Sequence, residues 1–305
     1  MFGNLITGTD IGETLNGTGR SDDILGMGGD DVLIGKRGKD RLDGGPGDDE
    51  LYGRKGDDLF IASVGADFFD GGGGRDTVSY VNADESVTIF LDRPGSSNFG
   101  WGAEHTFKSV GKIVGSRFED NLTGGVRNEV LKGAAGDDFL FGNEGNDFLI
   151  GGSGDDTING GAGNDIMRGG AGNDNFLLPF GTIGNDKMYG GRGNDQFIGG
   201  GEGRNLMKGG PGDDDILSNG GTNKVFGGKG FDTFSFFDSW VETTIKDFTQ
   251  DEDLIFLFQK ASDFDDLMTK TETVGADTVI TLNTGVIIIE GLTKTQLTID
   301  DFEFA

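Results

Sequence analysis

The sequence predicts an all-β protein: a right-handed parallel β-roll in two repeat blocks, with a short antiparallel insert and a β-rich C-terminal cap. Three observations lead to this fold class. Nine-residue units such as GGSGDDTIN (151–159) and GGAGNDIMR (160–168) follow one another in phase. One position of the unit is always apolar. The composition is glycine-rich and acidic, with 60 glycines among 305 residues and a formal net charge of −28.

The nonapeptide units fill two blocks, residues 1–79 and 115–235. Eight units run through the first block from Gly8 on, and thirteen run through the second, interrupted only at 178–180 and at Gly199. We number the slots one to nine from the first glycine of each unit. Slot eight is apolar in all 21 units, although only 34% of the chain is hydrophobic. Slot eight is therefore expected to form the core.

The chemistry of the slots predicts how the units stack. Slots one to six form a turn, in which glycine supplies backbone conformations that other residues avoid. Slots seven to nine allow only a short strand, whose middle side chain points inward while its neighbours point outward. One strand in every unit builds two facing sheets, so neighbours within a sheet are two units apart in sequence and their turns stack as well.

Slot six carries the candidate metal ligands, because it is Asp in 17 of the 21 units. A bare stack of carboxylates repels itself, whereas a hard cation with about six to eight oxygen ligands removes the repulsion, and Ca²⁺ suits such a site better than Mg²⁺. The four departures, Glu13, Glu129, Asn205 and Asn223, are expected to bind weakly or not at all. The predicted calcium ligands are Asp22, Asp31, Asp40, Asp49, Asp58, Asp67, Asp76, Asp120, Asp138, Asp147, Asp156, Asp165, Asp174, Asp186, Asp195, Asp214 and Asp232.

Turns that stack two units apart are expected to share metal sites. The predicted pairs are Asp31 with Asp49, Asp40 with Asp58, Asp138 with Asp156, Asp147 with Asp165, and Asp156 with Asp174.

The repeated unit resembles the RTX (repeats-in-toxin, hemolysin-type) nonapeptide, GGxGxDxUx, where U is a large apolar residue. The resemblance covers well over half of the chain and recurs in phase. It implies a protein that binds multiple Ca²⁺ ions and folds on binding them outside the cell. Calcium is the cofactor that we expect, and binding energy then becomes folding energy.

Residues 80–114 interrupt the repeat and form the predicted antiparallel insert. The stretch DTVSYVNADESVTIFLD alternates polar and apolar residues, as half-buried strands do. It resembles an insert common in RTX proteins that rejoins the roll at a sequence like VGSRFEDNLTG (114–124). The single histidine, His105, lies in this insert, and the simplest interpretation is a loop residue.

Residues 236–305 form the predicted cap and resemble the C-terminal domain of serralysin-type proteases. In that family the region closes the roll and carries an uncleaved type I secretion signal, which implies a type I secretion transporter as a partner and an extracellular, Gram-negative setting. The residues that match the family pattern are Ile245, Asp247, Phe248, Asp253, Ile255, Leu257, Leu297, Asp301 and Phe302.

Other routes to a membrane or out of the cell have little support in the sequence. The start, MFGNLITGTD, lacks a basic region followed by an apolar stretch, so we expect no N-terminal signal peptide. The longest apolar run, 286–289, is far shorter than the roughly 20 residues that a membrane span needs. The acidic charge disfavours nucleic acid and anionic membranes as partners.

No motif predicts an enzyme. There is no HExxH zinc helix and no GxSxG nucleophile elbow, one histidine cannot supply a three-histidine zinc site, and there is no cysteine. The acidic pairs fall in the turns. We therefore expect a non-enzymatic protein with no catalytic residues.

Two functional classes stay open. The first is an autonomous calcium-binding extracellular protein with an adhesive, matrix or cell-surface role. The second is a polysaccharide-binding module that resembles the repeat modules of alginate epimerases. The acidic composition counts against a polyanionic partner unless Ca²⁺ bridges the two.

One set of outward slots is apolar where polar residues are expected. Val130, Phe148 and Ile166 occupy slot seven, each two units from the next, Ile150 stands beside Phe148, and a smaller patch occupies 139–141. The insert or the cap is expected to cover this stripe, and a partner or self-association surface is the alternative.

Overall fold

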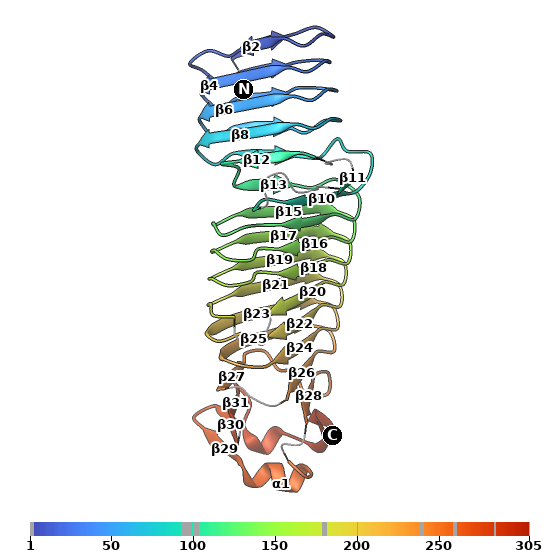
Figure 1. Cartoon of the computed structure of the whole chain (residues 1–305). Helices are drawn as coiled ribbons and strands as arrows, with labels where there is room; N and C mark the ends of the chain where they lie inside the picture. Colours follow the sequence, from blue (N-terminus) through green and yellow to red (C-terminus); the bar gives the residue numbers. More distant parts are fainter. Residues whose placement is uncertain are drawn as a thin grey trace. The chain divides into compact units, whose positions relative to one another are not determined.

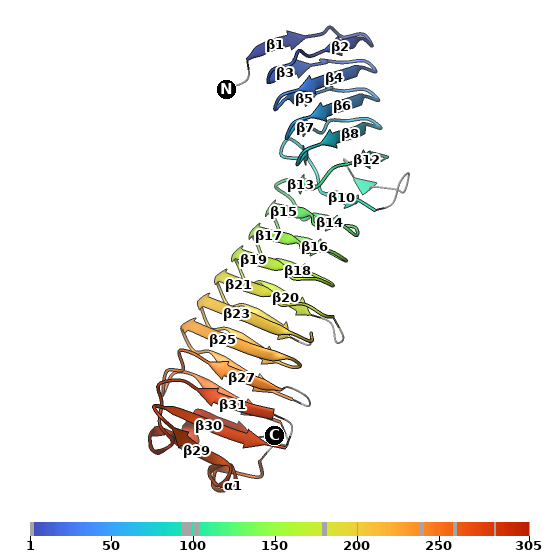
Figure 2. The ribbon, with the colours of Figure 1, turned by 90° about the vertical axis from the view of Figure 1, so that its left-hand side faces the viewer.

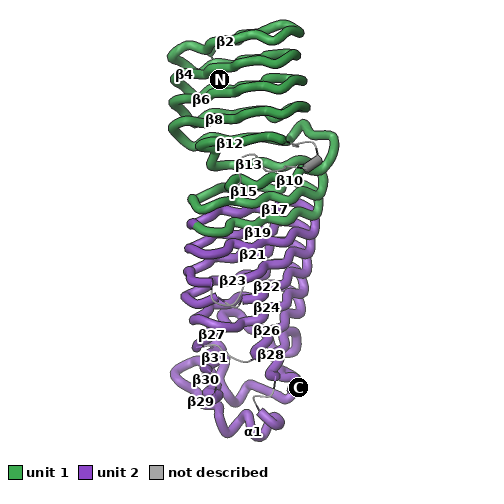
Figure 3. Tube along the Cα trace, viewed as in Figure 1, with its two compact units in different colours: residues 1–144 green, residues 145–305 purple. Residues whose placement is uncertain are grey.

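The chain consists of two compact units, residues 1–144 and 145–305, each of which is described by itself (Figure 3). The computed structural model describes residues 3–92, 99–100, 104–178, 182–199, 201–237, 241–258, 261–283 and 285–304. Both units are parallel β-solenoids, which confirms the predicted fold class (Figure 1). The division falls inside the second repeat block and not at the insert.

Unit 1 contains three sheets. The first consists, in spatial order, of β1 (Asn4–Thr7), β3 (Asp22–Leu25), β5 (Arg41–Asp43), β7 (Leu59–Ile61), β9 (Thr77–Ser79), β13 (Lys112–Val114) and β15 (Val130–Ala135). The second consists of β2 (Thr14–Asn16), β4 (Val32–Arg37), β6 (Glu50–Lys55), β8 (Phe68–Gly73) and β12 (Thr106–Lys108), and the third of β11 (Phe99–Gly100), β10 (Val87–Phe90), β14 (Asn121–Thr123) and β16 (Phe139–Phe141).

Unit 2 contains two sheets, whose strands form the ladder seen in Figure 2. The first consists of β17 (Phe148–Ser153), β19 (Ile166–Ala171), β21 (Lys187–Arg192), β23 (Arg204–Pro211), β25 (Thr222–Lys229), β27 (Glu242–Ile245), β31 (Gly285–Ile289), β30 (Asp277–Leu282) and β29 (Thr271–Val274). The second, here called the facing sheet, consists of β18 (Thr157–Asn159), β20 (Asn175–Leu178), β22 (Gln196–Gly199), β24 (Asp215–Ser218), β26 (Thr233–Phe236), β28 (Leu254–Leu257) and β32 (Phe302–Phe304).

The register follows the sequence period. Ile24 lies beside Leu42, which occupies the same slot two nonapeptides later. The interruption at 178–180 lengthens this offset by the length of the inserted segment, and Met167 lies beside Met188. Slot eight is buried in every nonapeptide except the first, where Leu15 is only half-buried near the end of the stack. The apolar core of unit 1 and that of unit 2 are thus columns of slot-eight side chains.

The glycine at slot four is required where stacked turns approach each other closely. Gly56 has φ 148°, and a Cβ at this position would collide with the carbonyl oxygen of Gly38 in the turn beside it. Neither the backbone angle nor the space suits any other residue.

The insert contains antiparallel pairing, but most of its strands extend the solenoid. Val87 of β10 lies opposite Gly100 of β11 in an antiparallel pair. In contrast, β12 pairs in parallel with β8, and β13 lies between β9 and β15 in parallel with both. The second sheet therefore ends at β12, and the third begins with β10 and β11.

The C-terminal region first continues the solenoid and then closes it. Ile255 lies beside Phe234, and Phe234 is 1% exposed, so the last repeat rung is covered. An antiparallel hairpin of β30 and β31 follows, together with α1 (Phe264–Thr269), η1 (Lys294–Gln296) and η2 (Ile299–Asp301). No helix within the described residues is long and apolar enough to cross a membrane.

Candidate metal centres in the stacked turns

All 17 aspartates predicted as metal ligands are buried, each directly before the strand that follows its turn or, for Asp22, at the first residue of that strand. The fold joins them in ladders. The backbone N–H of Asp31 donates to Oδ1 of Asp49 at 2.8 Å, and that of Asp40 donates to Oδ1 of Asp58 at 2.8 Å. One carboxylate oxygen is thus used to hold the neighbouring turn, and the other is left for a different partner.

The same contact joins the other predicted pairs that lie within one unit. The backbone N–H of Asp147 donates to Asp165 at 2.8 Å, and that of Asp156 donates to Asp174 at 2.9 Å. The remaining predicted pair, 138 with 156, combines residues of both units.

Nine of these aspartates have a second oxygen, Oδ2, that is buried and has no hydrogen-bond partner within the part of the chain that the structure describes. We call their turns open turns. A buried carboxylate oxygen without a partner is costly, so it points to a missing ligand. The nine residues are Asp31, Asp40, Asp49, Asp58, Asp76, Asp165, Asp174, Asp195 and Asp214.

Backbone oxygens complete the donor set of the open turns. Oδ2 of Asp31 and the carbonyl oxygen of Gly44, in the next stacked turn, crowd the same point beside Gly26. The equivalent position beside Gly190 is crowded by Asp195 and Gly209. The described residues contain no cluster of three or more His, Cys, Asp or Glu side chains that could hold a metal. A carboxylate oxygen of one turn beside a carbonyl oxygen of the next turn suits Ca²⁺, which accepts both kinds of ligand.

The electrostatics of the open turns also favour a cation. Burial, together with neighbouring carboxylates, raises the pKa of Asp49 and of Asp58 to about 7. Burial likewise raises the pKa of Asp195 to about 7 and that of Asp174 and Asp214 to about 6. The charged form of these groups is therefore unfavourable unless a cation lies beside them.

Other turns satisfy the same carboxylate with their own backbone, and we call these capped turns. The N–H of Thr18 donates to Oδ2 of Asp22, and the N–H of Ser116 donates to Oδ2 of Asp120, both at 2.5 Å. In Asp22, burial opposes ionisation, but hydrogen bonds from Thr18 and from Asn4 lower its pKa below the usual value.

Capped turns also hold the two slot-six glutamates and a carboxylate of the C-terminal region. The N–H of Thr9 donates to Glu13 at 2.8 Å, and that of Gly125 donates to Glu129 at 3.1 Å. The N–H of Thr249 donates to Asp253 at 2.7 Å. Sequence reasoning missed this second class of turn, although a Ser or Thr at slot two in place of glycine marks most of its members.

In the turn of Asp67, the partner of the carboxylate is a residue of the insert, His105. His105 is 2% exposed, and its Nε2 lies 3.3 Å from Oδ2 of Asp67, while its Nδ1 lies 2.9 Å from the hydroxyl of Tyr80. The hydroxyl of Ser63 donates to the same Oδ2 at 3.2 Å. His105 lies outside the strands, as expected, but it ties the insert to a turn of the first block.

The two slot-six asparagines are engaged by other side chains. Nδ2 of Asn205 donates to Oδ1 of Asn223 at 3.2 Å, and Nδ2 of Asn223 donates to the hydroxyl of Ser218 at 2.9 Å. Their weak or absent metal binding stays a prediction.

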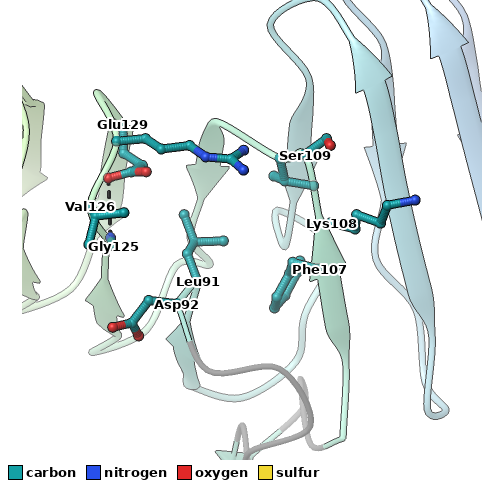
Figure 4. Close-up of a pocket in the computed structure, with 10 residues that line it drawn as sticks. Leu91, Asp92, Phe107, Lys108, Ser109, Gly125, Val126 and Glu129 are labelled. Carbon is teal, nitrogen blue, oxygen red and sulfur yellow. Dashed lines mark hydrogen bonds between the residues drawn. The ribbon is translucent and has the colours of Figure 1, made fainter.

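A separate cavity of about 420 Å³ lies where the second sheet of unit 1 gives way to the third (Figure 4). Its lining includes Leu91, Phe107, Lys108 and Glu129. Two of its charged groups have partners, since Lys108 pairs with Asp70 at 2.8 Å and Glu129 accepts the N–H of Gly125. Asp92 and Arg127 line the cavity as well.

Comparison with known proteins identifies the repeat. A family model described as the RTX calcium-binding nonapeptide repeat matches residues 7–42, 43–78, 114–149, 123–158, 141–176, 180–202 and 199–234. No curated protein matches the chain. Among solved structures, the chain is similar to the crystal structure of extracellular lipase LipA from Serratia marcescens, with 15% identity and a TM-score of 0.26. That match covers 96% of this chain and 40% of the lipase, and a likeness this low carries no functional argument.

Proposed function

The chain belongs to the family of RTX calcium-binding nonapeptide-repeat proteins, and from this premise we propose that it is a secreted, non-enzymatic protein that folds on binding several Ca²⁺ ions outside the cell. We further propose that the folded protein has an adhesive, matrix or cell-surface role. The observation that carries the proposal is the column of buried, unpartnered Oδ2 atoms in the open turns. Without bound cations, these buried carboxylates would have no positive charge beside them.

Each part of an open turn has a role in binding. The slot-six aspartate supplies Oδ2, while its Oδ1 holds the neighbouring turn through a backbone N–H. Glycine at slot one leaves space for the carboxylate, and stacked turns bring carbonyl oxygens beside it. Bound Ca²⁺ would supply the positive charge that lets buried carboxylates ionise, so binding and folding would be one process.

A calcium titration followed by circular dichroism tests the coupling of folding to metal. We expect β-structure to develop with a midpoint on the order of 10⁻⁴–10⁻³ M Ca²⁺, the range of extracellular modules. Mg²⁺ serves as the control, because it prefers an octahedral site and holds its waters, and it should act only at much higher concentration. Full β-content in excess chelator at neutral pH would contradict the proposal.

Secretion is proposed to depend on the C-terminal region. Its support is the match of Leu297, Asp301 and Phe302 to the family ending. Deletion of residues 250–305 should abolish export through a type I transporter. The matched control is deletion of 35–52, which removes two whole nonapeptides and keeps the phase of the repeat. Normal export of the first variant, or equal loss in both, would contradict a signal in this region.

A further inference from the structure

The first sheet of unit 2 has a charge opposite to that of the chain. The strands β17, β19, β21, β23 and β25 contain seven basic residues and no acidic residue. Strands β18, β20, β22, β24 and β26 of the facing sheet contain one acidic residue, Asp215, and no basic residue. These seven are a large share of the 25 basic residues in a chain of net charge −28. We call the five strands of the first set the cationic sheet.

The register brings the basic side chains of the cationic sheet into two adjoining rows. In one row Lys187 of β21 lies beside Ile166 of β19, and Lys224 of β25 lies beside Leu206 of β23. In the other row Arg168, Tyr189, Lys208 and Phe226 lie side by side on successive strands. Arg192, Arg204 and Lys229 stand near the strand ends. Since neighbouring strands are about 4.8 Å apart, the two rows together present one outward cation on each of β19, β21, β23 and β25, and none on β17.

None of these cations forms a salt bridge with a carboxylate among the described residues, and two of them, Arg168 and Lys208, lie over aromatic rings. The guanidinium of Arg168 lies 5.3 Å from the ring centre of Phe148 and 5.8 Å from that of Tyr189. Nζ of Lys208 lies 4.6 Å from the ring centre of Phe226. Such contacts orient a cation but leave its charge available to a partner. They also cover part of the predicted apolar stripe, because Arg168 lies over the ring of Phe148, which is half-buried.

A row of this kind fits one class of partner better than others. A linear polymer with a carboxylate on successive sugars can follow the row, its carboxylates on Lys and Arg and its sugar faces on Tyr189 and Phe226. In duplex DNA each strand has one charge per roughly 3.4 Å of helix axis, which is denser than the row. A membrane surface would offer no repeat for the evenly spaced cations to match.

We propose that the cationic sheet binds a linear, carboxylated polysaccharide. This inference rests on the proposed extracellular role and names its partner. It also answers the objection that the acidic composition raises, because local charge and not net charge decides what approaches a surface.

Binding of the full chain, saturated with Ca²⁺, to short oligogalacturonate tests the inference by calorimetry or thermophoresis. We expect binding that weakens about tenfold or more between roughly 50 and 200 mM salt, and none to neutral dextran. The triple variant Lys187→Glu, Lys208→Glu, Lys224→Glu should raise the dissociation constant by about tenfold or more, and the milder triple change to Gln should give a smaller loss in the same direction.

The facing sheet supplies the matched control. Thr157→Glu, Gln196→Glu and Thr233→Glu add charge at outward positions there and should leave oligogalacturonate binding unchanged. Unchanged binding of the Lys→Glu variant would overturn the inference and would be the result if Ca²⁺ alone bridged polymer and protein. Tighter binding to phosphatidylserine vesicles or to single-stranded DNA would overturn it as well.

The calcium titration separates the two levels of the argument. If the chain folds with Ca²⁺ but does not bind oligogalacturonate, the inference about the cationic sheet is refuted and the proposed calcium-coupled folding is not. A chain whose β-content does not respond to Ca²⁺ refutes the proposed function.

Discussion

Open turns and capped turns use the same repeat for different purposes, and they lie in different parts of the chain. Most open turns lie within the repeat blocks, as at Asp40 and Asp195, and that of Asp76 lies in the last unit of the first block. Capped turns lie at the beginning of the first block, beside the insert and in the C-terminal region, as at Asp22, Asp120 and Asp253. The turns of Asp22 and Asp120 have a repeat turn on one side and a non-repeating segment on the other, whereas a metal of about six to eight ligands takes oxygens from stacked turns. The difference teaches that this chain supplies its own hydrogen bonds where stacking cannot complete a metal site.

The pH dependence of the metal-free protein is the largest expected effect. Burial raises the pKa of open-turn carboxyls such as Asp49, Asp58 and Asp195 to about 7, above the ordinary value of 3.8. The folded state therefore binds more protons than the unfolded state between about pH 4 and 7, and the stability that protonation gives is lost as the pH rises through that window. In chelator, we expect β-structure at about pH 4 and its loss towards pH 7.

Saturating Ca²⁺ should reverse this trend, because protons compete with the metal for the same oxygens. Circular dichroism and urea unfolding across the pH range, in chelator and in saturating Ca²⁺, would measure both trends. A metal-free protein that is most stable at neutral pH would show that the open turns do not control folding.

Single substitutions should then separate the two kinds of turn. Asp195→Asn lies in an open turn and should remove at least one bound Ca²⁺, with a loss of about 2.7 kcal/mol at a metal concentration about 100 times the dissociation constant. Asp22→Asn lies in a capped turn, where an amide oxygen can still accept from Thr18. It should leave the Ca²⁺ count unchanged and cost about 1 kcal/mol with or without metal.

Native mass spectrometry counts the bound ions, and calcium-dependent urea unfolding gives the stability. Equal loss of Ca²⁺ in both variants would remove the distinction between open and capped turns.

The smallest effect concerns slot two, where the two kinds of turn differ in backbone. Met27, in the open turn of Asp31, has φ 84°, whereas Thr18, in a capped turn, does not have a positive φ. Met27→Gly should stabilise the folded protein by about 1 kcal/mol, because a left-handed backbone costs a residue with a Cβ. Thr18→Gly should destabilise it by a similar amount, about 1 kcal/mol, because it relieves no strain and loosens the cap.

Unfolding at fixed Ca²⁺ measures both variants. A change of the same sign in the two would show that slot-two conformation does not distinguish the turns.

The sequence alone determined the repeated part of this protein. A fixed period places each strand beside the strand two units away, so the inward position of Leu42 and the turn position of Asp40 follow from counting. Apolar slot eight must be buried and charged slot six must find a partner, and both requirements are local to the unit. This is why the fold class, the core and the family could be predicted.

Only the tertiary structure decided what the non-repeating residues do. The contact of His105 with Asp67 depends on where the insert returns. The cap on Asp22 depends on the N–H and hydroxyl of Thr18 reaching its carboxylate, a contact that Thr at slot two marks but that only the folded turn establishes. The cationic sheet arises because every second strand belongs to the same sheet, so that Arg168, Lys187 and Lys208 become neighbours while the strands between them face the other way. Composition averages these charges over the whole chain, whereas the fold sorts them by face, and a partner meets one face at a time.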